Sequence, residues 1–351
     1  MAKDVLKEVN EFRQDLVSGD WVLFATGRAG RPSAERPGAD VNASLRTSEP
    51  DIVSGSDANQ CPFDDLRASG NEIVSEYEKS NKEKWVTVIK NKYPAVVPLT
   101  CAPIESVGPF SHTAANGFHE VVVTKDHQRN FPDFTLEETA LVLKAYRDRY
   151  LDIAQNECGS YIQIFNNSGK EAGASVLHPH SQILSTPILP PTVSRSINGS
   201  AKFFKKNKKR IHGAILDWEI EQKKRIVFEN NLFIAFCPFT SKRSYETRIF
   251  PKIPSARFEV ADGQNLESCA EVLNFCLSQL KKIFKDNFNF NFFIHTAPVR
   301  EDSKIPSSEF YHWHIEVIPH YSALAGFDFS TGIIVNTIDP DKAAEEIRHA
   351  S

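Results

Sequence analysis

The sequence predicts an α+β fold in which one structural unit occurs twice. Two segments have the apolar spacing of long amphipathic helices, and several short segments rich in β-branched and aromatic residues have the composition of strands. These elements follow one another in the same order in each half of the chain, and each half contains a strand with an H-x-H motif. A duplicated unit is the simplest explanation of this order.

The two helices are predicted from Thr135 to about Ile153 and from about Leu266 to Phe284. Thr135 and Glu138 have the spacing of a capping box, in which each side chain bonds the backbone N–H of the other residue. The predicted strands share short length and boundaries at Pro, Gly or Asn. They are Trp21–Phe24, Phe118–Thr124, Tyr161–Phe165, Ser181–Leu184, Leu232–Phe236, Thr247–Phe250, Phe290–His295 and Trp313–Ile318.

Two irregular segments separate these elements. Residues 30–60 are rich in Pro, Ser, Ala and Asp, which is typical of a long loop. The proline-rich run Thr186–Pro191 predicts a linker between the two units. We therefore expect one unit at residues 1–195, carrying the first H-x-H motif, and a second at residues 196–351.

The composition limits the class of protein. The chain has 351 residues, an apolar fraction of 41% and a net charge of −4, so it can form a substantial core and lacks the basic excess typical of nucleic-acid-binding proteins. We expect no nucleic-acid partner and no membrane association, because no run of 18 apolar residues occurs. The cysteines are scattered, which favours free thiols and a cytoplasmic location. They are Cys61, Cys101, Cys158, Cys237, Cys269 and Cys276.

The run His178-Pro-His180-Ser-Gln182 is the strongest candidate for catalytic chemistry. On a strand, the three alternate side chains share one face. A neutral imidazole is a good nucleophile toward phosphorus, and the phosphoramidate that it forms can be discharged by a second acceptor. The preceding residues 166–175 are rich in small residues and hydrogen-bond donors, and their glycines allow close backbone approach to a phosphate.

These motifs resemble the active-site segment of the galactose-1-phosphate uridylyltransferase family. The resemblance rests on Phe165-Asn-Asn-Ser-Gly169, Gly173-Ala-Ser175 and His178-Pro-His-Ser-Gln182, and extends from about Arg13 to Arg348. The similar N-terminal segments are Arg13–Phe24, Gly27–Pro32 and Asn91-Lys-Tyr-Pro94. The resemblance implies two fused histidine-triad-like domains, each an antiparallel sheet with helices packed on its faces, and a homodimer whose second half completes the partner's site.

The resemblance also implies a ping-pong mechanism. His180 would attack the α-phosphorus of a sugar nucleotide, and a sugar 1-phosphate or phosphate would then accept the nucleotidyl group. Gln182 would bind the α-phosphate, and Arg28 and Arg31 would grip phosphate oxygens. The remaining nucleotide- or phosphate-binding candidates are Asn91, Asn167, Gly169 and Ser175.

Two metal sites are implied by the same resemblance. In the first, Asp64 stands where relatives carry the second cysteine of a Cys-x-x-Cys pair, and Cys61, His127 and His178 complete a tetrahedral set suited to structural zinc. In the second, His295, His314 and Glu316 could ligate iron or zinc. The linker glutamate that serves as a fourth ligand in relatives is not evident.

Several functions remain open at this point. The uridylyltransferase assignment leads narrowly over the related ADP-glucose phosphorylase branch, in which phosphate is the acceptor and a glycine, here Gly326, replaces a hexose-contacting lysine. A histidine-triad nucleotide hydrolase is a third hypothesis. In such hydrolases the motif is H-x-H-x-H, but here Gln182 occupies the place of the third histidine and cannot protonate a leaving group. A catalytically dead nucleotide-binding module is disfavoured because His180 is intact.

Overall fold

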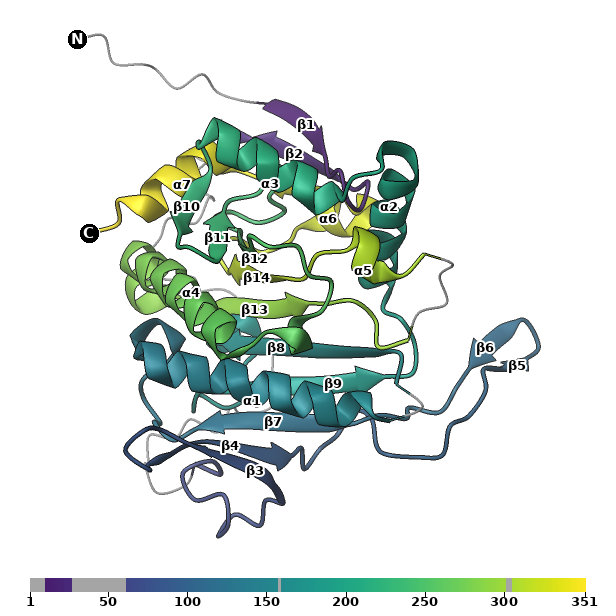
Figure 1. The fold of residues 1–351 in the computed structure, drawn as a ribbon, viewed down its shortest axis with the longest axis vertical. Helices are drawn as coiled ribbons and strands as arrows, with labels where there is room; N and C mark the ends of the chain where they lie inside the picture. The colour runs from purple at the N-terminus through teal and green to yellow at the C-terminus, as the bar shows by residue number, and fades with distance from the viewer. Residues whose placement is uncertain (1–9, 27–60, 157–158, 301–304) are drawn as a thin grey trace.

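The computed structural model describes residues 10–26, 61–156, 159–300 and 305–351, and its centre is one ten-stranded antiparallel sheet (Figure 1). From one edge to the other, the strands are β10 (Ile226–Glu229), β11 (Phe233–Phe236), β12 (Thr247–Pro251), β14 (His314–Pro319), β13 (Phe290–His295), β8 (Tyr161–Ser168), β9 (His180–Thr186), β7 (His119–Thr124), β4 (Lys84–Lys90) and β3 (Ile73–Glu78). The predicted α+β class with antiparallel pairing is confirmed.

The order of strands in this sheet reflects the predicted duplication. The first half of the chain supplies β3, β4, β7, β8 and β9, and the second half supplies β10 to β14. The halves meet where β8 pairs with β13, and the two H-x-H strands, β9 and β14, lie one strand away on either side. Because both halves share one continuous sheet, the division near residue 195 stays a prediction.

The two predicted helices pack against the same face of the sheet and form its main core. They are α1 (Leu136–Ala154) and α4 (Gly263–Phe284), and the cluster of buried residues runs without interruption beneath both (Figure 1). The capping box of α1 is present, since Thr135 Oγ1 accepts the Glu138 N–H and Glu138 Oε2 accepts the Thr135 N–H at 2.9 Å. The opposite face of the sheet carries smaller apolar clusters.

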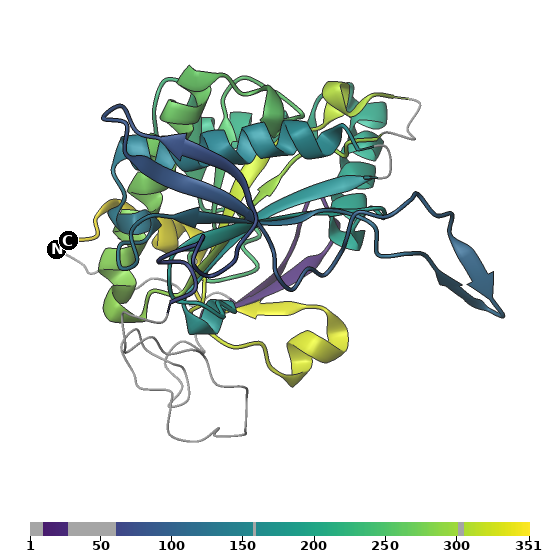
Figure 2. The ribbon, with the colours of Figure 1, turned by 90° about the horizontal axis from the view of Figure 1, so that it is seen from below.

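Further elements surround this sheet. The helices are α2 (Pro191–Asn207), α3 (Ile211–Gln222), α5 (Ser307–Phe310), α6 (Gly326–Thr331) and α7 (Pro340–Arg348). A three-stranded sheet joins β1 (Asn10–Gln14) and β2 (Trp21–Ala25) to β15 (Ile334–Asn336), so segments near both ends of the described chain lie side by side. The hairpin of β5 (Glu105–Val107) and β6 (Phe110–His112) projects away from the body, as Figure 2 shows.

The predicted strands are all present, with small shifts at their ends, but α2 and α3 were not predicted. The prediction of free cysteines holds only in part. Cys61, Cys237, Cys269 and Cys276 are free and buried, whereas Cys101 is disulfide-bonded. The irregular loop predicted at residues 30–60 lies outside the described residues. No helix among the described residues has the length and apolar character needed to cross a membrane.

Candidate active site

His180, the predicted nucleophile, begins β9 and is 7% exposed. Its Nδ1 lies 2.9 Å from the carbonyl oxygen of His178. Because a carbonyl can only accept, Nδ1 carries the hydrogen and the lone pair of the neutral ring lies on Nε2. Burial lowers the pKa of His180, so the ring is neutral near pH 7. The structure thus presents His180 in the tautomer that a nucleophilic imidazole needs.

Gln182 lies on the same face of β9, two residues further along. Its neighbour Ser181 faces the other way, toward the helices, where it contacts the hydroxyl of Tyr146. Gln182 Oε1 lies 2.7 Å from Nε2 of His119, at the first position of β7. His119 is not among the site residues predicted from the sequence. Its alternation with Val121 and Val123 in the predicted strand was the available signal, because residues two apart share a face.

The glycine-rich segment after β8 forms a tight 3₁₀ turn at Lys170–Ala172. Gly169 has φ of +88°, and a Cβ there would also collide with the side chain of Asn289, so both conformation and space require glycine. Asn167 Oδ1 accepts a hydrogen bond from Asn291 Nδ2 at 2.8 Å, which leaves the Asn167 amide N–H groups directed elsewhere. Ser175 is exposed in the loop before His178.

The other predicted phosphate ligands have different outcomes. Asn91 joins the site through His119, since its Nδ2 lies 3.1 Å from the Nε2 that contacts Gln182. Arg28 and Arg31 lie outside the described residues. The described loop at Cys61–Asp64 also reaches the predicted nucleophile, because the Phe63 ring lies edge-on to His180 with centroids 5.3 Å apart. The described site therefore combines β7, β8, β9 and this loop.

The four residues predicted for the first metal site come together from three distant segments. The candidate ligand atoms of Cys61, Asp64, His127 and His178 all lie within 4.8 Å of one another. Asp64 Oδ1 is 2.7 Å from His127 Nδ1 and 3.0 Å from His178 Nδ1. The two ring nitrogens are 3.2 Å apart, close to the separation of two ligands on one tetrahedral zinc. The geometry is compatible with a metal ion.

The protonation of His178 also fits a metal ligand. Its Nε2 lies 2.6 Å from the carbonyl oxygen of Thr124 and so carries the hydrogen, which directs the Nδ1 lone pair at Asp64 and His127. Burial lowers the pKa of His178. Burial would raise the pKa of Asp64, but the hydrogen bond from His127 outweighs it and lowers this pKa overall. A neutral histidine and an ionised carboxylate are the forms that bind metal.

The second predicted group is also assembled, on β13 and β14. The ligand atoms of His295, His314 and Glu316 lie within 4.8 Å of one another, with His295 Nε2 3.2 Å from Glu316 Oε2. His314 Nδ1 lies 3.2 Å from the carbonyl oxygen of His312, the same arrangement as His180 and His178 in the first half. The duplicated strands therefore hold their second histidine in the same tautomer.

An arginine distinguishes the second group from the first. Arg248 on β12 bonds Glu246 at 2.8 Å, and its Nε lies 3.7 Å from Glu316 Oε2. Burial alone would raise the pKa of Glu316, but Arg248 beside it holds this pKa well below its usual range. Glu316 is therefore an ionised carboxylate that already has one cationic neighbour. Three histidine or carboxylate ligands still fit a metal here, although the described residues supply no fourth carboxylate or thiolate within the group.

The His180–Gln182 face of β9 and the second group are separated across the sheet. Gln182 pairs with Phe165, Phe165 with Phe293, and Phe293 with Glu316. Three strand spacings amount to about 14 Å. The second group therefore cannot contact the same phosphate as His180, and two phenylalanines fill the space between them.

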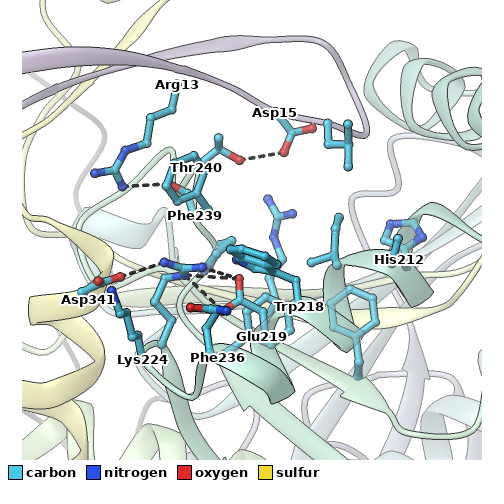
Figure 3. A pocket seen from close by; sticks show the side chains of 18 of the residues that line it. Arg13, Asp15, His212, Trp218, Glu219, Lys224, Phe236, Phe239, Thr240 and Asp341 are labelled. Atoms are coloured by element: carbon cyan, nitrogen blue, oxygen red, sulfur yellow. Dashed lines mark hydrogen bonds and ion pairs between the residues drawn. The ribbon is translucent and has the colours of Figure 1, made fainter.

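A cavity of about 570 Å³ lies elsewhere, lined by residues of α3, the turn after β1, and strands β11 and β12 (Figure 3). Trp218, Phe236 and Phe239 line it, and Arg225 beside it bonds both Glu219 and Asp341. His178, His180 and Gln182 are not among its lining residues. Its size alone does not identify a catalytic centre, so the residues of β9 stay the predicted catalytic site.

Comparisons with known proteins place the chain in a family. Residues 3–190 match the family model of the galactose-1-phosphate uridyl transferase N-terminal domain, and residues 111–350 match a domain of unknown function, DUF4921. The chain is 29% identical to an ADP-glucose phosphorylase of Arabidopsis thaliana, over 97% of this chain and 93% of that protein. It is also 29% identical to a galactose-1-phosphate uridylyltransferase of Thermotoga maritima, over 82% and 89% respectively.

The solved structures include the Arabidopsis thaliana ADP-glucose phosphorylase with bound ADP-glucose. That structure aligns with a TM-score of 0.77 and 27% identity, over 98% of this chain and 100% of that chain. The histidine motif, the duplicated sheet and these matches define an enzyme that transfers nucleotidyl groups. The chain belongs to the galactose-1-phosphate uridylyltransferase family.

Proposed function

We propose that this enzyme transfers a nucleotidyl group from a sugar nucleotide through a covalent intermediate on His180. The observation that carries the proposal is the hydrogen bond from His180 Nδ1 to the carbonyl of His178, which leaves the Nε2 lone pair free. Nε2 attacks the α-phosphorus, a P–N bond forms, and the P–O bond to the sugar phosphate breaks. A second phosphate oxygen then attacks the phosphorus, and the His180 lone pair is regenerated.

The leaving group in this scheme needs no acid. A sugar 1-phosphate leaves as a stable anion, and an incoming phosphate or sugar phosphate is already anionic. Gln182 can stabilise charge on the α-phosphate through its amide N–H groups but cannot supply a proton. Transfer between phosphates is therefore favoured over hydrolysis, for which a protonating group in this position would help.

Two donor and acceptor pairs are proposed. The first is a UDP-hexose with a hexose 1-phosphate, as in galactose metabolism, in keeping with the N-terminal and central motifs and the similarity to the Thermotoga maritima enzyme. The second is ADP-glucose with phosphate, supported by the similarity to the Arabidopsis thaliana enzyme along almost the whole chain. Gly326 supports the second pair as well, because it offers no cationic side chain to a hexose phosphate.

We propose that Cys61, Asp64, His127 and His178 hold a structural zinc ion. Zinc there would accept the lone pairs of the facing ring nitrogens, balance the charge of the carboxylate and fix the carbonyl of His178, which in turn orients His180. At the second group, iron or zinc held by His295, His314 and Glu316 would tie β13 to β14. Neither ion takes part in bond breaking in this proposal.

We also propose a homodimer in which the second half completes the partner's site, and a cytoplasmic location. Sedimentation or light scattering would test the homodimer. The four buried free thiols favour a reducing compartment, whereas the disulfide at Cys101 does not, and comparing masses before and after alkylation would test the redox state in cells.

Intact-protein mass spectrometry tests the central proposal. The protein is incubated with UDP-glucose or with ADP-glucose, without acceptor, beside the His180→Ala variant. As a control, His112→Ala removes an exposed histidine in the β5–β6 hairpin. A uridylyl adduct absent only from His180→Ala supports the first pair, and an adenylyl adduct with that pattern supports the second. No adduct with either donor, together with free mononucleotide, would favour hydrolysis and overturn the covalent transfer.

A further inference from the structure

We propose that His119 is a positioning residue that turns the amide of Gln182 so that its N–H groups face the α-phosphate. His119 lies at the start of β7 and contacts Gln182 but not His180 in any hydrogen bond among the described residues. The inference rests on the proposed function, because it assigns to His119 the orientation of a group that binds the transferred phosphate.

The tautomer of His119 follows from a backbone contact. The N–H of Ala95 donates to His119 Nδ1 at 3.1 Å. A backbone N–H cannot accept, so Nδ1 must present its lone pair and the ring hydrogen lies on Nε2. This assignment depends on the main chain alone and not on the orientation chosen for any side-chain amide.

The orientation of Gln182 follows from that tautomer. His119 Nε2 lies 2.7 Å from the end of the Gln182 side chain, and a donor at this distance requires an acceptor, so Oε1 must face His119. The amide nitrogen of Gln182 then points away from His119 and has no hydrogen-bond partner among the described residues. Because Gln182 shares its face with His180, both N–H groups are available to the phosphate that His180 attacks.

Asn91 leaves this pairing undisturbed. Its Oδ1 accepts the N–H of Tyr93 at 2.8 Å, so only its Nδ2 approaches the ring, 3.1 Å from His119 Nε2. With the hydrogen on Nε2 both nitrogens are donors, so this approach is not a hydrogen bond and Asn91 does not take the hydrogen that Nε2 gives to Gln182. The Asn91 N–H also bonds the His119 carbonyl at 2.9 Å, which holds the histidine in place.

Without His119, the two orientations of the Gln182 amide become nearly equal in energy. A carbonyl oxygen turned toward the phosphate would repel it, whereas an N–H group attracts it. Hydrogen bonds to a charged group are among the stronger ones, so loss of the fixed orientation should slow nucleotidylation by roughly ten- to hundredfold.

A double-mutant cycle separates positioning from a general structural role. The first-order rate of adduct formation is measured at saturating donor for wild type, His119→Ala, Gln182→Ala and the double variant. We expect His119→Ala to be roughly ten- to hundredfold slower than wild type, but to slow the Gln182→Ala protein by less than about threefold. His119→Gln, which can place an amide N–H near the former Nε2, should recover part of the rate. His112→Ala is the matched exposed-histidine control.

Equal effects of His119→Ala in both backgrounds would overturn the inference, and so would a rate unchanged by His119→Ala. The tautomer gives a second, activity-independent test by two-bond ¹H–¹⁵N correlation of the histidine rings in the wild-type protein. We expect a protonated Nε2 and an unprotonated Nδ1 for His119, and the reverse tautomer would refute the arrangement. If wild type forms no adduct, the proposed function fails, while the ring spectrum still decides the orientation.

Discussion

Replacing Asp64 with alanine should remove most of the thermal stabilisation that zinc gives this protein. Asp64 Oδ1 is the atom closest to both ring nitrogens of the first group, so its loss leaves three ligands and a position open to water. The variant also loses hydrogen bonds that exist without metal. The informative quantity is therefore the shift in Tm on adding zinc, and not Tm itself.

The expected size follows from linkage. Free zinc at about 100 times Kd stabilises the folded state by about 2.7 kcal/mol. An unfolding entropy of about 2 cal/mol/K per residue gives about 0.7 kcal/mol/K for 351 residues. Wild type should therefore gain about 4 °C. If the loss of one ligand weakens binding about a hundredfold, the same zinc concentration gives Asp64→Ala less than about 1 °C.

The assay is differential scanning fluorimetry of chelator-stripped protein in a zinc buffer, with metal content read in parallel. Asp65→Ala is the matched control, because Asp65 is an adjacent exposed aspartate outside the ligand group. Asp64→Cys should retain the shift or reach it at lower zinc, since thiolate is the softer ligand. Equal zinc shifts in wild type and Asp64→Ala, with one bound zinc in each, would refute the assigned ligand set.

Three further predictions concern stability. Burial lowers the pKa of His212 from 6.5 to about 3, so below pH 6.5 the unfolded chain binds a proton that the folded protein does not. As the pH falls below 6.5, this group therefore lowers the free energy of unfolding by about 1.4 kcal/mol per pH unit. His212→Phe should flatten this dependence of the free energy of unfolding on pH. Arg149 pairs with Glu120 through two bonds of 2.7 and 2.8 Å, and Arg149→Ala should cost about 3–5 kcal/mol because it leaves a buried carboxylate unpaired. A Cβ on Gly199 of α2 would collide with a carbonyl oxygen of the turn after β1, so Gly199→Ala should cost about 1–3 kcal/mol, whereas Gly213→Ala in α3 should be neutral or stabilising.

Urea unfolding measures all three effects, with the first repeated between pH 7 and pH 5. An unchanged pH slope in His212→Phe would show that this ring titrates similarly in both states. Near-wild-type stability of Arg149→Ala would mean that water or another cation reaches Glu120. Equal stabilities of the Gly199→Ala and Gly213→Ala proteins would contradict the close approach of α2 to the turn.

The sequence predicted the repeated unit because the evidence for it is local. Helix spacing, the capping box at Thr135 and Glu138, and the alternation of His178, His180 and Gln182 each depend on residues within a few positions of one another. Local periodicity also placed the strands to within a few residues. It did not predict α2 and α3, because the proline-rich run before α2 is typical of a linker, whereas Pro191 begins the helix.

The residues for both metal groups were proposed from motifs, and the structure brings each group within 4.8 Å. Whether they bind metal stays a prediction. No local pattern indicates that Arg248 lies beside Glu316, since that contact depends on β12 pairing with β14 across a separation of about seventy residues. A cation so placed changes the charge of the second group, and only the strand order determines it.

Tertiary structure alone also joined His119 to Gln182. The two residues are separated by the whole of α1 and β8, and they meet because β7 pairs with β9 rather than with its neighbour in sequence. The sequence by itself determined which side chains could do chemistry and which face of a strand they occupy. Which of their atoms donate and which accept hydrogen bonds was decided only by the tertiary structure. A tautomer and an amide orientation are set by partners that only strand pairing brings into contact.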